Sequence, residues 1–256
     1  MIETYTLVTS TYSYDVKYDQ TDPTRFFMYV GNPHKYPCVG LVIYPLDNKI
    51  DLNGATHSPD CAVGGNMHTG LAGTSHMLKV AIKHVMSLFP HIDRIDLTDN
   101  SQFICDVGTR SQMDVSMPDH NLLLYGKTMY QRRFGAKATD RDISNAVHRA
   151  HQFLKQTVTI LAEDIGVAVE GKLSWHKLFQ QISEDSGCGY FTKPRMRQLQ
   201  RIFSLPTLMF TDWYIPAKTV RTWDVDWQVQ HRRMHRMRGG GLAPPRWNEL
   251  PYSMAQ

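Results

Sequence analysis

The 256-residue chain has little cysteine, and none of it forms a metal or redox motif. Its four cysteines, Cys38, Cys61, Cys105 and Cys188, stand far apart and include no C-x-x-C pair. Closely spaced pairs are typical of zinc knuckles, and a higher cysteine density is typical of small disulfide scaffolds. We therefore expect reduced thiols and no bound metal.

The sequence also lacks a long apolar run. No stretch reaches the roughly 18 to 20 residues that a membrane-spanning helix needs. The first residues, Met1-Ile-Glu-Thr-Tyr-Thr, do not show the basic and then apolar layout of a secretion signal. These features predict a soluble intracellular protein without a membrane span.

Several common catalytic motifs are missing as well. There is no G-x-S-x-G elbow, and Gly126-Lys-Thr lacks the upstream glycine of a phosphate-binding P-loop. The pairs His148/His151 and His231/His235 have helical spacing but lack the glutamate of a zinc helix. Serine hydrolases, P-loop hydrolases and zinc proteases therefore lose support.

What the sequence does contain is enough apolar residues for a large core and an uneven distribution of charge. It is 42% hydrophobic and 11% aromatic, which is typical of a globular protein. From Lys193 onward, eleven Lys and Arg face four Asp and Glu, a net charge of +7, whereas residues 1–192 carry −3. The basic character therefore belongs to the C-terminal quarter, which suits a polyanion or an acidic protein surface, or simply a solvated face.

The first part of the chain is rich in strand-forming residues. Thr, Tyr, Val and Phe are dense in Glu3–Tyr14, Phe26–Val30 and Cys38–Tyr44, which predicts three strands. Residues 47–72 are rich in Gly, Asn, Asp, Pro and His. We expect a long irregular loop there.

From Gly73 the period changes from two to between three and four residues. Thr74 or Ser75 is expected to cap a helix that ends before Pro90, and His91–Thr98 alternates as a strand. A loop over 102–118 and a second helix from Asp119 to about Phe134 follow, with Gly135 as its C-terminal stop and a further strand from Ala136. A strand that follows a helix closely indicates a β-α-β crossover and parallel pairing.

This order of elements resembles the GCN5-related N-acetyltransferase (GNAT) fold. More narrowly, Gly73-Thr-Ser-His-Met-Leu, Thr98-Asp-Asn-Ser101 and Leu124-Tyr-Gly-Lys-Thr-Met-Tyr-Gln-Arg-Arg-Phe-Gly135 are similar to GNAT-like proteins of large DNA viruses. The resemblance spans residues 65–137. It implies an α/β protein with a mixed central sheet flanked by helices.

The resemblance also implies acetyl-CoA as the cofactor. In the family, small residues between a strand and a helix let backbone N–H groups approach the diphosphate, where the helix N-terminus adds positive charge. The matching residues are Gly70, Ala72, Gly73 and Thr74, with Met67 where the family has Arg or Gln. These four residues are the candidate cofactor-binding set.

The family's chemistry adds a base and an acid. By resemblance, Asp96 or Asp99 helps to deprotonate an amine and Tyr130 protonates the departing thiolate. Each residue also has a purely structural interpretation. Asp99 suits a turn that ends a strand, and Tyr130 suits the core face of a helix.

Beyond Thr139 the chain exceeds a GNAT-like core. Asp140 is expected to cap a long helix that closes at Gly166, and shorter helices are predicted over 174–182 and 193–203. The last segment mixes tryptophan with arginine, a pattern typical of single-stranded nucleic acid binding or of anchors for a partner protein. These candidate residues are Arg221, Trp223, Trp227, Arg232, Arg233, Arg236, Arg238 and Trp247.

The sequence thus predicts a GNAT-like α/β core over 1–138, a helical extension over 139–205 and an extended basic aromatic arm over 206–256. Two functions stay open. One is an acetyl-CoA-dependent N-acetyltransferase that acts on an amine. The other is a catalytically inactive GNAT-fold structural or interaction protein, associated with a viral capsid or virion, whose arm binds nucleic acid or a partner; a viral source would place it in the host cytoplasm or the virion.

Overall fold

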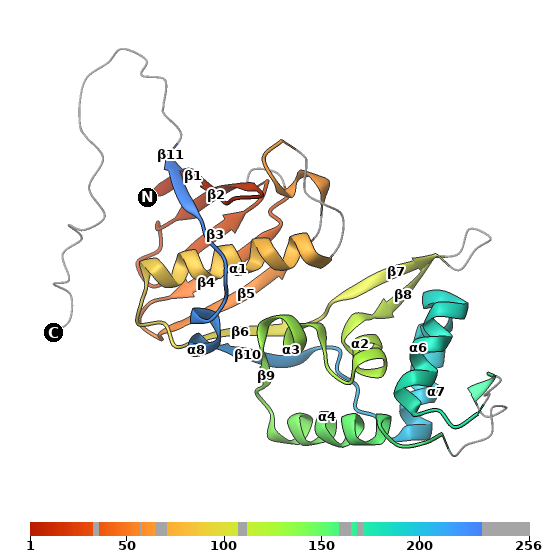
Figure 1. The fold of residues 1–256 in the computed structure, drawn as a ribbon. Helices are drawn as coiled ribbons and strands as arrows, with labels where there is room; N and C mark the ends of the chain where they lie inside the picture. The colour runs from red at the N-terminus through yellow and green to blue at the C-terminus, as the bar shows by residue number, and fades with distance from the viewer. Residues whose placement is uncertain are drawn as a thin grey trace, which may run out of the picture.

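The structure is a computed structural model, and it describes residues 1–32, 36–56, 58–64, 71–106, 112–158, 165–167 and 171–231. Within these ranges the chain is a mixed α/β protein with a large, mostly antiparallel sheet flanked by helices (Figure 1). The sheet has nine strands in the order β11-β1-β2-β3-β4-β5-β6-β10-β9, and a separate hairpin pairs β7 with β8.

The N-terminal strands form an antiparallel meander. They are β1 (Ile2–Val8), β2 (Ser13–Asp19), β3 (Phe26–Val30) and β4 (Val39–Tyr44). The predicted strands over 26–30 and 38–44 are confirmed. The predicted strand over 3–14 is instead the whole of β1 and the start of β2, because a turn in which Thr9 and Tyr12 hydrogen-bond reverses the chain between them.

The loop predicted over 47–72 contains a central strand, β5 (Lys49–Ala55), so that prediction is wrong for its first part. Asp, Asn and Gly in this strand have low strand propensity and are common in turns, which hid it. The side chains of Asp51 and Asn53 stand on an open face of the sheet, whereas the buried Ile50 faces the core. The sheet pairing on both sides of β5 outweighs the local preference.

Helix α1 (Leu71–Leu88) covers one face of the sheet (Figure 1). Its apolar stripe, including Met77, Ala81 and Val85, is fully buried, as the helical period predicts. The helix begins at Leu71, before the predicted caps Thr74 and Ser75, so both residues lie inside the helix.

The expectation of reduced thiols is contradicted by two disulfides. Cys38 at the start of β4 bonds Cys61, which ends a 3-10 turn over Pro59–Cys61. Cys105 bonds Cys188 across a separation of 83 residues. Sequence spacing could not reveal these pairs, because each depends on chain segments that only the folded sheet brings together.

After α1 the chain enters β6 (Arg94–Asp99), which confirms the predicted strand with a shifted start. The predicted loop over 102–118 is wrong, since β7 (Gln102–Asp106) and β8 (Gln112–Ser116) form a hairpin. The predicted single helix to Phe134 is two helices, α2 (Met117–Tyr125) and α3 (Met129–Phe134). Gly126 ends α2 in the left-handed conformation with φ 67°, which splits the helix.

The predicted end of the helix at Gly135, the strand after it and the cap at Asp140 agree with the structure. Gly135 caps α3 with φ 67°, and Lys137–Ala138 forms the short strand β9. Asp140 caps α4 (Arg141–Leu154), although this helix ends well before the predicted Gly166.

The next helices lie at the end of the sheet that holds β9 and β10, away from β1 (Figure 1). They are α6 (Trp175–Ser186) and α7 (Lys193–Phe203), joined by a 3-10 turn over Gly187–Phe191. The predicted helices over 174–182 and 193–203 are confirmed. The rings of Phe153, Trp175 and Phe203 pack together and join α4, α6 and α7 into one layer.

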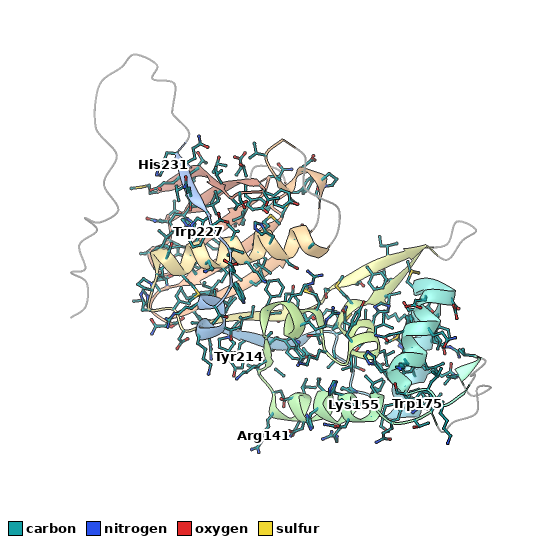
Figure 2. The ribbon with its side chains drawn as sticks, in the orientation of Figure 1. Arg141, Lys155, Trp175, Tyr214, Trp227 and His231 are labelled. Atoms are coloured by element: carbon teal, nitrogen blue, oxygen red, sulfur yellow. A yellow bond between two sulfur atoms is a disulfide. The ribbon has the colours of Figure 1, made fainter. Side chains whose placement is uncertain are left out.

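The chain then returns to the sheet. Strand β10 (Thr211–Pro216) pairs with β6 and β9, the short helix α8 (Ala217–Arg221) follows, and β11 (Gln228–His231) pairs with β1 at the opposite edge (Figure 2). Segments from both ends of the described chain therefore build one sheet. None of the described helices is long and apolar enough to cross a membrane.

Candidate functional site

The strands β5 and β6 are paired along only part of their length, and the sheet opens between their carboxyl ends. They are the one parallel pair among the described strands, and they pair only from Lys49 with Arg94 to Leu52 with Leu97. Beyond Leu52, β5 stays paired with β4, and beyond Leu97, β6 stays paired with β10. The two strands therefore separate at their carboxyl ends, where α1 begins.

A cleft of about 480 Å³ lies at this divergence. It collects residues from the end of β5, the first turns of α1, the segment after β6, and α3. Its lining is mostly apolar, with a few hydroxyl and amide groups. The residues are Ala55, Thr56, Thr74, Ser75, Leu78, Asn100, Ser101, Gln102, Phe103, Met117, Met129, Tyr130 and Phe134.

Tyr130 is held in the cleft wall by the local structure of α3. A capping box between Thr128 and Gln131 starts the helix and fixes its first turn. Tyr130 is buried and its ring packs against Phe134. Burial raises the pKa of the phenol above its ordinary value, and the nearby charge of Asp99 adds to the increase. The hydroxyl therefore keeps its proton at neutral pH.

Asp99 ends β6 and is 1% exposed. Its Oδ1 accepts the backbone N–H of Ser101 at 3.2 Å and the Ser101 hydroxyl at 2.5 Å. Its Oδ2 is buried and has no hydrogen-bond partner in the described part of the chain. Burial raises the pKa of Asp99 to about 6, against the hydrogen bonds from Ser101 and with a smaller contribution from Asp119. Asp99 thus forms the expected turn and also keeps one free carboxylate oxygen.

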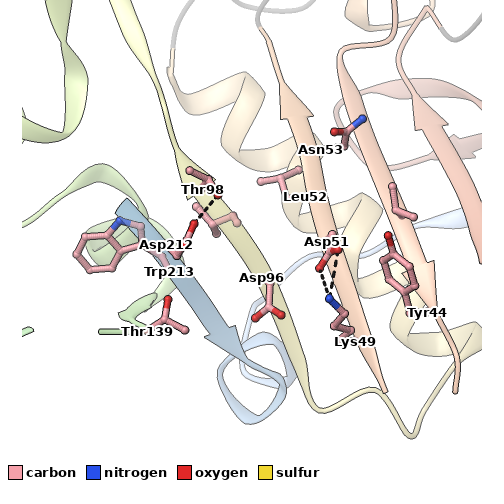
Figure 3. Close-up of a pocket in the computed structure, with 12 residues that line it drawn as sticks. Tyr44, Lys49, Asp51, Leu52, Asn53, Asp96, Thr98, Thr139, Asp212 and Trp213 are labelled. Atoms are coloured by element: carbon pink, nitrogen blue, oxygen red, sulfur yellow. Dashed lines mark hydrogen bonds and ion pairs between the residues drawn. The ribbon is translucent and has the colours of Figure 1, made fainter. Parts of the chain in front are cut away.

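Asp96 lies on the other face of β6, because side chains alternate along a strand. It lines a second cavity, opposite α1, together with Lys49 and Asp51 (Figure 3). The structure therefore separates the two candidate bases. Asp99 shares the α1 side with Tyr130, and Asp96 does not.

The candidate cofactor residues fall at the start of α1, apart from Gly70, which lies outside the described residues. Ala72, Gly73 and Thr74 form the first turn of the helix. Thr74 lines the cleft, whereas Ala72 is exposed and Gly73 is buried. The first turn of α1 therefore borders the cleft.

The aromatic residues expected to bind partners are folded against the body. Trp223 is buried, with its ring 5.6 Å from that of Phe134, and Trp227 is half-buried and donates its indole N–H to His84 at 3.2 Å (Figure 2). Arg221 is exposed. The remaining candidates, Arg232, Arg233, Arg236, Arg238 and Trp247, lie outside the described residues.

Sequence reasoning missed the polar side chains that β5 and β10 add beside Asp96. They are Lys49, Asp51 and Asn53 on β5 and Asp212 on β10. The alternation Lys49-Ile-Asp-Leu-Asn53 carried the signal, since period two places the three polar residues on one face.

No protein-family model, curated protein or solved structure matches the chain. The site is therefore interpreted from its own residues. Within the part of the chain that the structure describes, no three His, Cys, Asp or Glu residues are grouped so that they could hold a metal ion.

Proposed function

We propose that the protein is an N-acetyltransferase of the GNAT type that uses acetyl-CoA to acetylate an amine. One observation carries the proposal. The single described parallel pair, β5 and β6, diverges beside the first turn of α1, and the resulting cleft holds Tyr130 in its wall. A crossover helix that begins at a gap between parallel strands provides both a pocket and a site for an anion.

The lining of the cleft suits the thioester donor acetyl-CoA. Phe103, Met117 and Met129 supply apolar surface for the arm of the cofactor. The first turn of α1 borders the cleft and is the positive end of the helix dipole, which favours the diphosphate there. Beyond Leu52, the side of β5 that faces β6 pairs with no other described strand, so its main-chain groups can meet the amides of the donor.

Two groups on the α1 side supply the proton transfers. A pKa of about 6 leaves Asp99 mostly ionised at neutral pH and close enough to the working range to accept a proton from the substrate ammonium through water, since Asp99 itself does not line the cleft. The free amine then attacks the carbonyl carbon, forming the C–N bond and releasing the C–S bond. Tyr130, protonated at neutral pH, donates its proton to the thiolate, and the second proton lost by the acylated nitrogen restores the Tyr130 hydroxyl.

Binding of acetyl-CoA tests this proposal. Met129→Trp fills the cleft from α3, and Lys127→Trp adds the same side chain at an exposed position two residues earlier. Calorimetry should show binding by the native protein and by Lys127→Trp, with a loss of about tenfold or more in Met129→Trp. Well-folded native protein without detectable binding would exclude the acetyltransferase.

The disulfides favour a second candidate, a GNAT-fold structural protein without catalysis in a viral particle. All four cysteines are paired, and disulfides persist in oxidising surroundings rather than in the cytosol. In this case the basic C-terminal segment would contact nucleic acid or a partner protein. Retention on nucleic acid at rising salt, with and without residues 232–256, tests that contact, and an unchanged profile would dismiss the segment as the binding element.

A further inference from the structure

The cavity on the sheet face opposite α1 contains two aspartates, Asp51 and Asp96, on neighbouring strands. Its volume is about 400 Å³, and β4, β5, β6 and β10 form its floor (Figure 3). The register of the parallel pair places Asp51 directly opposite Asp96. Two carboxylates directly opposite on one face repel each other, so this pair lowers the stability of the sheet.

Neighbouring cations reduce this repulsion only in part. Lys49 Nζ lies 3.2 Å from Asp51 Oδ1, and Arg94 Nε lies 3.2 Å from Asp96 Oδ2. The third carboxylate, Asp212, accepts the Thr98 hydroxyl at 2.5 Å. Of the charged side chains that line the cavity, three are Asp and one is Lys, since the half-exposed Arg94 stands outside it. The cavity therefore keeps an excess of negative charge.

Asp96 also has an oxygen without a partner. Its Oδ1 is buried and accepts no hydrogen bond from any described residue. Burial raises the pKa of Asp96, against the attraction of Arg94 and Lys49. An unmatched buried acceptor is costly, and a ligand with N–H donors would satisfy it.

We propose that this cavity binds a primary alkylammonium group between Asp51 and Asp96. The ammonium head carries three donors and a positive charge, which match the free Oδ1 and the repelling pair. Leu52, which also lines the cavity, offers apolar surface to an aliphatic stem, whereas Lys49 Nζ lies over the ring of Tyr44 at 4.8 Å from its centroid. A metal ion fits less well, since the described residues hold no cluster of metal ligands.

The position of the cavity gives the bound amine a role as acetyl acceptor, which rests on the proposed function, whereas the binding itself does not. Asn53 and Thr98 line this cavity, and Ala55 and Asn100, two residues further along the same strands, line the cleft. The cavity and the cleft therefore flank the same end of the β5–β6 pair, on opposite faces of the sheet. The amine could come from a free diamine or from a lysine side chain.

Binding of two probes without acetyl-CoA tests the inference. Calorimetry would use 1,4-diaminobutane as the free amine and Nα-acetyl-lysine methylamide as the lysine side chain, with 1-butanol as the uncharged comparison. We expect at least one amine to bind and 1-butanol not to bind. Asp96→Asn and Asp51→Asn should each weaken amine binding about tenfold, because each removes one charge of the pair.

Asp47→Asn is the matched control, since Asp47 is exposed in the turn that leads into β5 and does not line the cavity. It should bind as the native protein does. Native protein that binds neither amine, or Asp96→Asn that binds as tightly as native protein, would overturn the inference. Amine binding without acetyl-CoA binding would instead reject the acetyltransferase and keep the amine site.

Discussion

The two faces of the β5–β6 pair carry different kinds of side chains. On the α1 face, Ile50 and Ile95 are fully buried in the core, and Asp99 sits beside the cleft at the strand end. On the opposite face, Asp51 and Asp96 line an open cavity and face each other. Strand alternation thus lets one pair of strands carry a core on one side and charged groups on the other.

The two faces also contribute differently to the stability of the folded protein. The α1 face gains free energy from burial, whereas the open face carries repulsion that a folded sheet tolerates only because the core compensates. Truncating a buried side chain on the α1 face should therefore cost stability, whereas neutralising a carboxylate of the opposed pair on the open face should raise it.

The largest effect is expected from Ile95→Ala on the α1 face. The side chain is fully buried, so its truncation should cost about 3 to 4 kcal/mol of unfolding free energy. Arg94→Ala, the neighbour on the open face, should cost less than about 0.5 kcal/mol, because its ion pair with Asp96 is half-exposed. Denaturant titration measures both, and equal losses would contradict the assignment of the two faces.

Asp99→Asn should change the pH dependence of stability by an amount on the order of 3 kcal/mol. The pKa of Asp99 is raised to about 6 in the folded state from 3.8, so between these values the folded protein binds more protons than the unfolded chain. Asp99 therefore makes the native protein less stable as pH rises from about 4 to 6, and the asparagine variant lacks this loss. Denaturation at several pH values gives the difference.

Other groups titrate in the same pH range, but their contributions to stability cancel when native protein is compared with Asp99→Asn. Burial lowers the pKa of His84 and of His120 to about 4, so both oppose folding as pH falls below their ordinary value. His84 is held between the Tyr5 hydroxyl and the Trp227 indole, away from the cleft. Both histidines are present in native protein and variant, so a constant difference across pH 4 to 6 would refute the role of Asp99.

Tyr130→Phe should lower the rate of acetyl transfer about 100-fold, or about 2.7 kcal/mol, and leave acetyl-CoA affinity unchanged. The ring stays packed on Phe134 while the proton donor is lost. Tyr125→Phe, an exposed tyrosine on α2, is the control and should keep its rate. Steady-state kinetics would separate the cases, and a Tyr130→Phe enzyme with native kcat would remove Tyr130 from the mechanism.

The smallest effect is a gain in stability on the open face. Asp96→Asn removes one charge of the opposed pair and a partly buried carboxylate, at the cost of a half-exposed ion pair with Arg94. The variant should be more stable by about 0.5 kcal/mol. Asp47→Asn should be unchanged within the error of thermal unfolding, and a loss of stability in Asp96→Asn would show that the repulsion is already balanced.

Prediction from the sequence worked best where local contacts decide. The caps at Gly135 and Asp140 and the helices α6 and α7 were predictable, since capping and the helical period involve residues only a few positions apart. Prediction failed at β5 and at the hairpin β7–β8, whose Asp, Asn and Gly residues suggested a loop. Among the site residues, Tyr130 and Asp99 were named in advance, and Asp51 and Asp212 were not.

By itself the sequence determined the positions of α1, α6 and α7 and the strands Phe26–Val30 and Val39–Tyr44, because these depend on neighbours along the chain. Only the tertiary structure decided that Asp96 and Asp99 face opposite ways from a shared strand, that four cysteines pair, and that β11 forms the edge of the sheet beside β1. These features depend on strand pairing between distant segments, whose register is set by the whole sheet rather than by local preference.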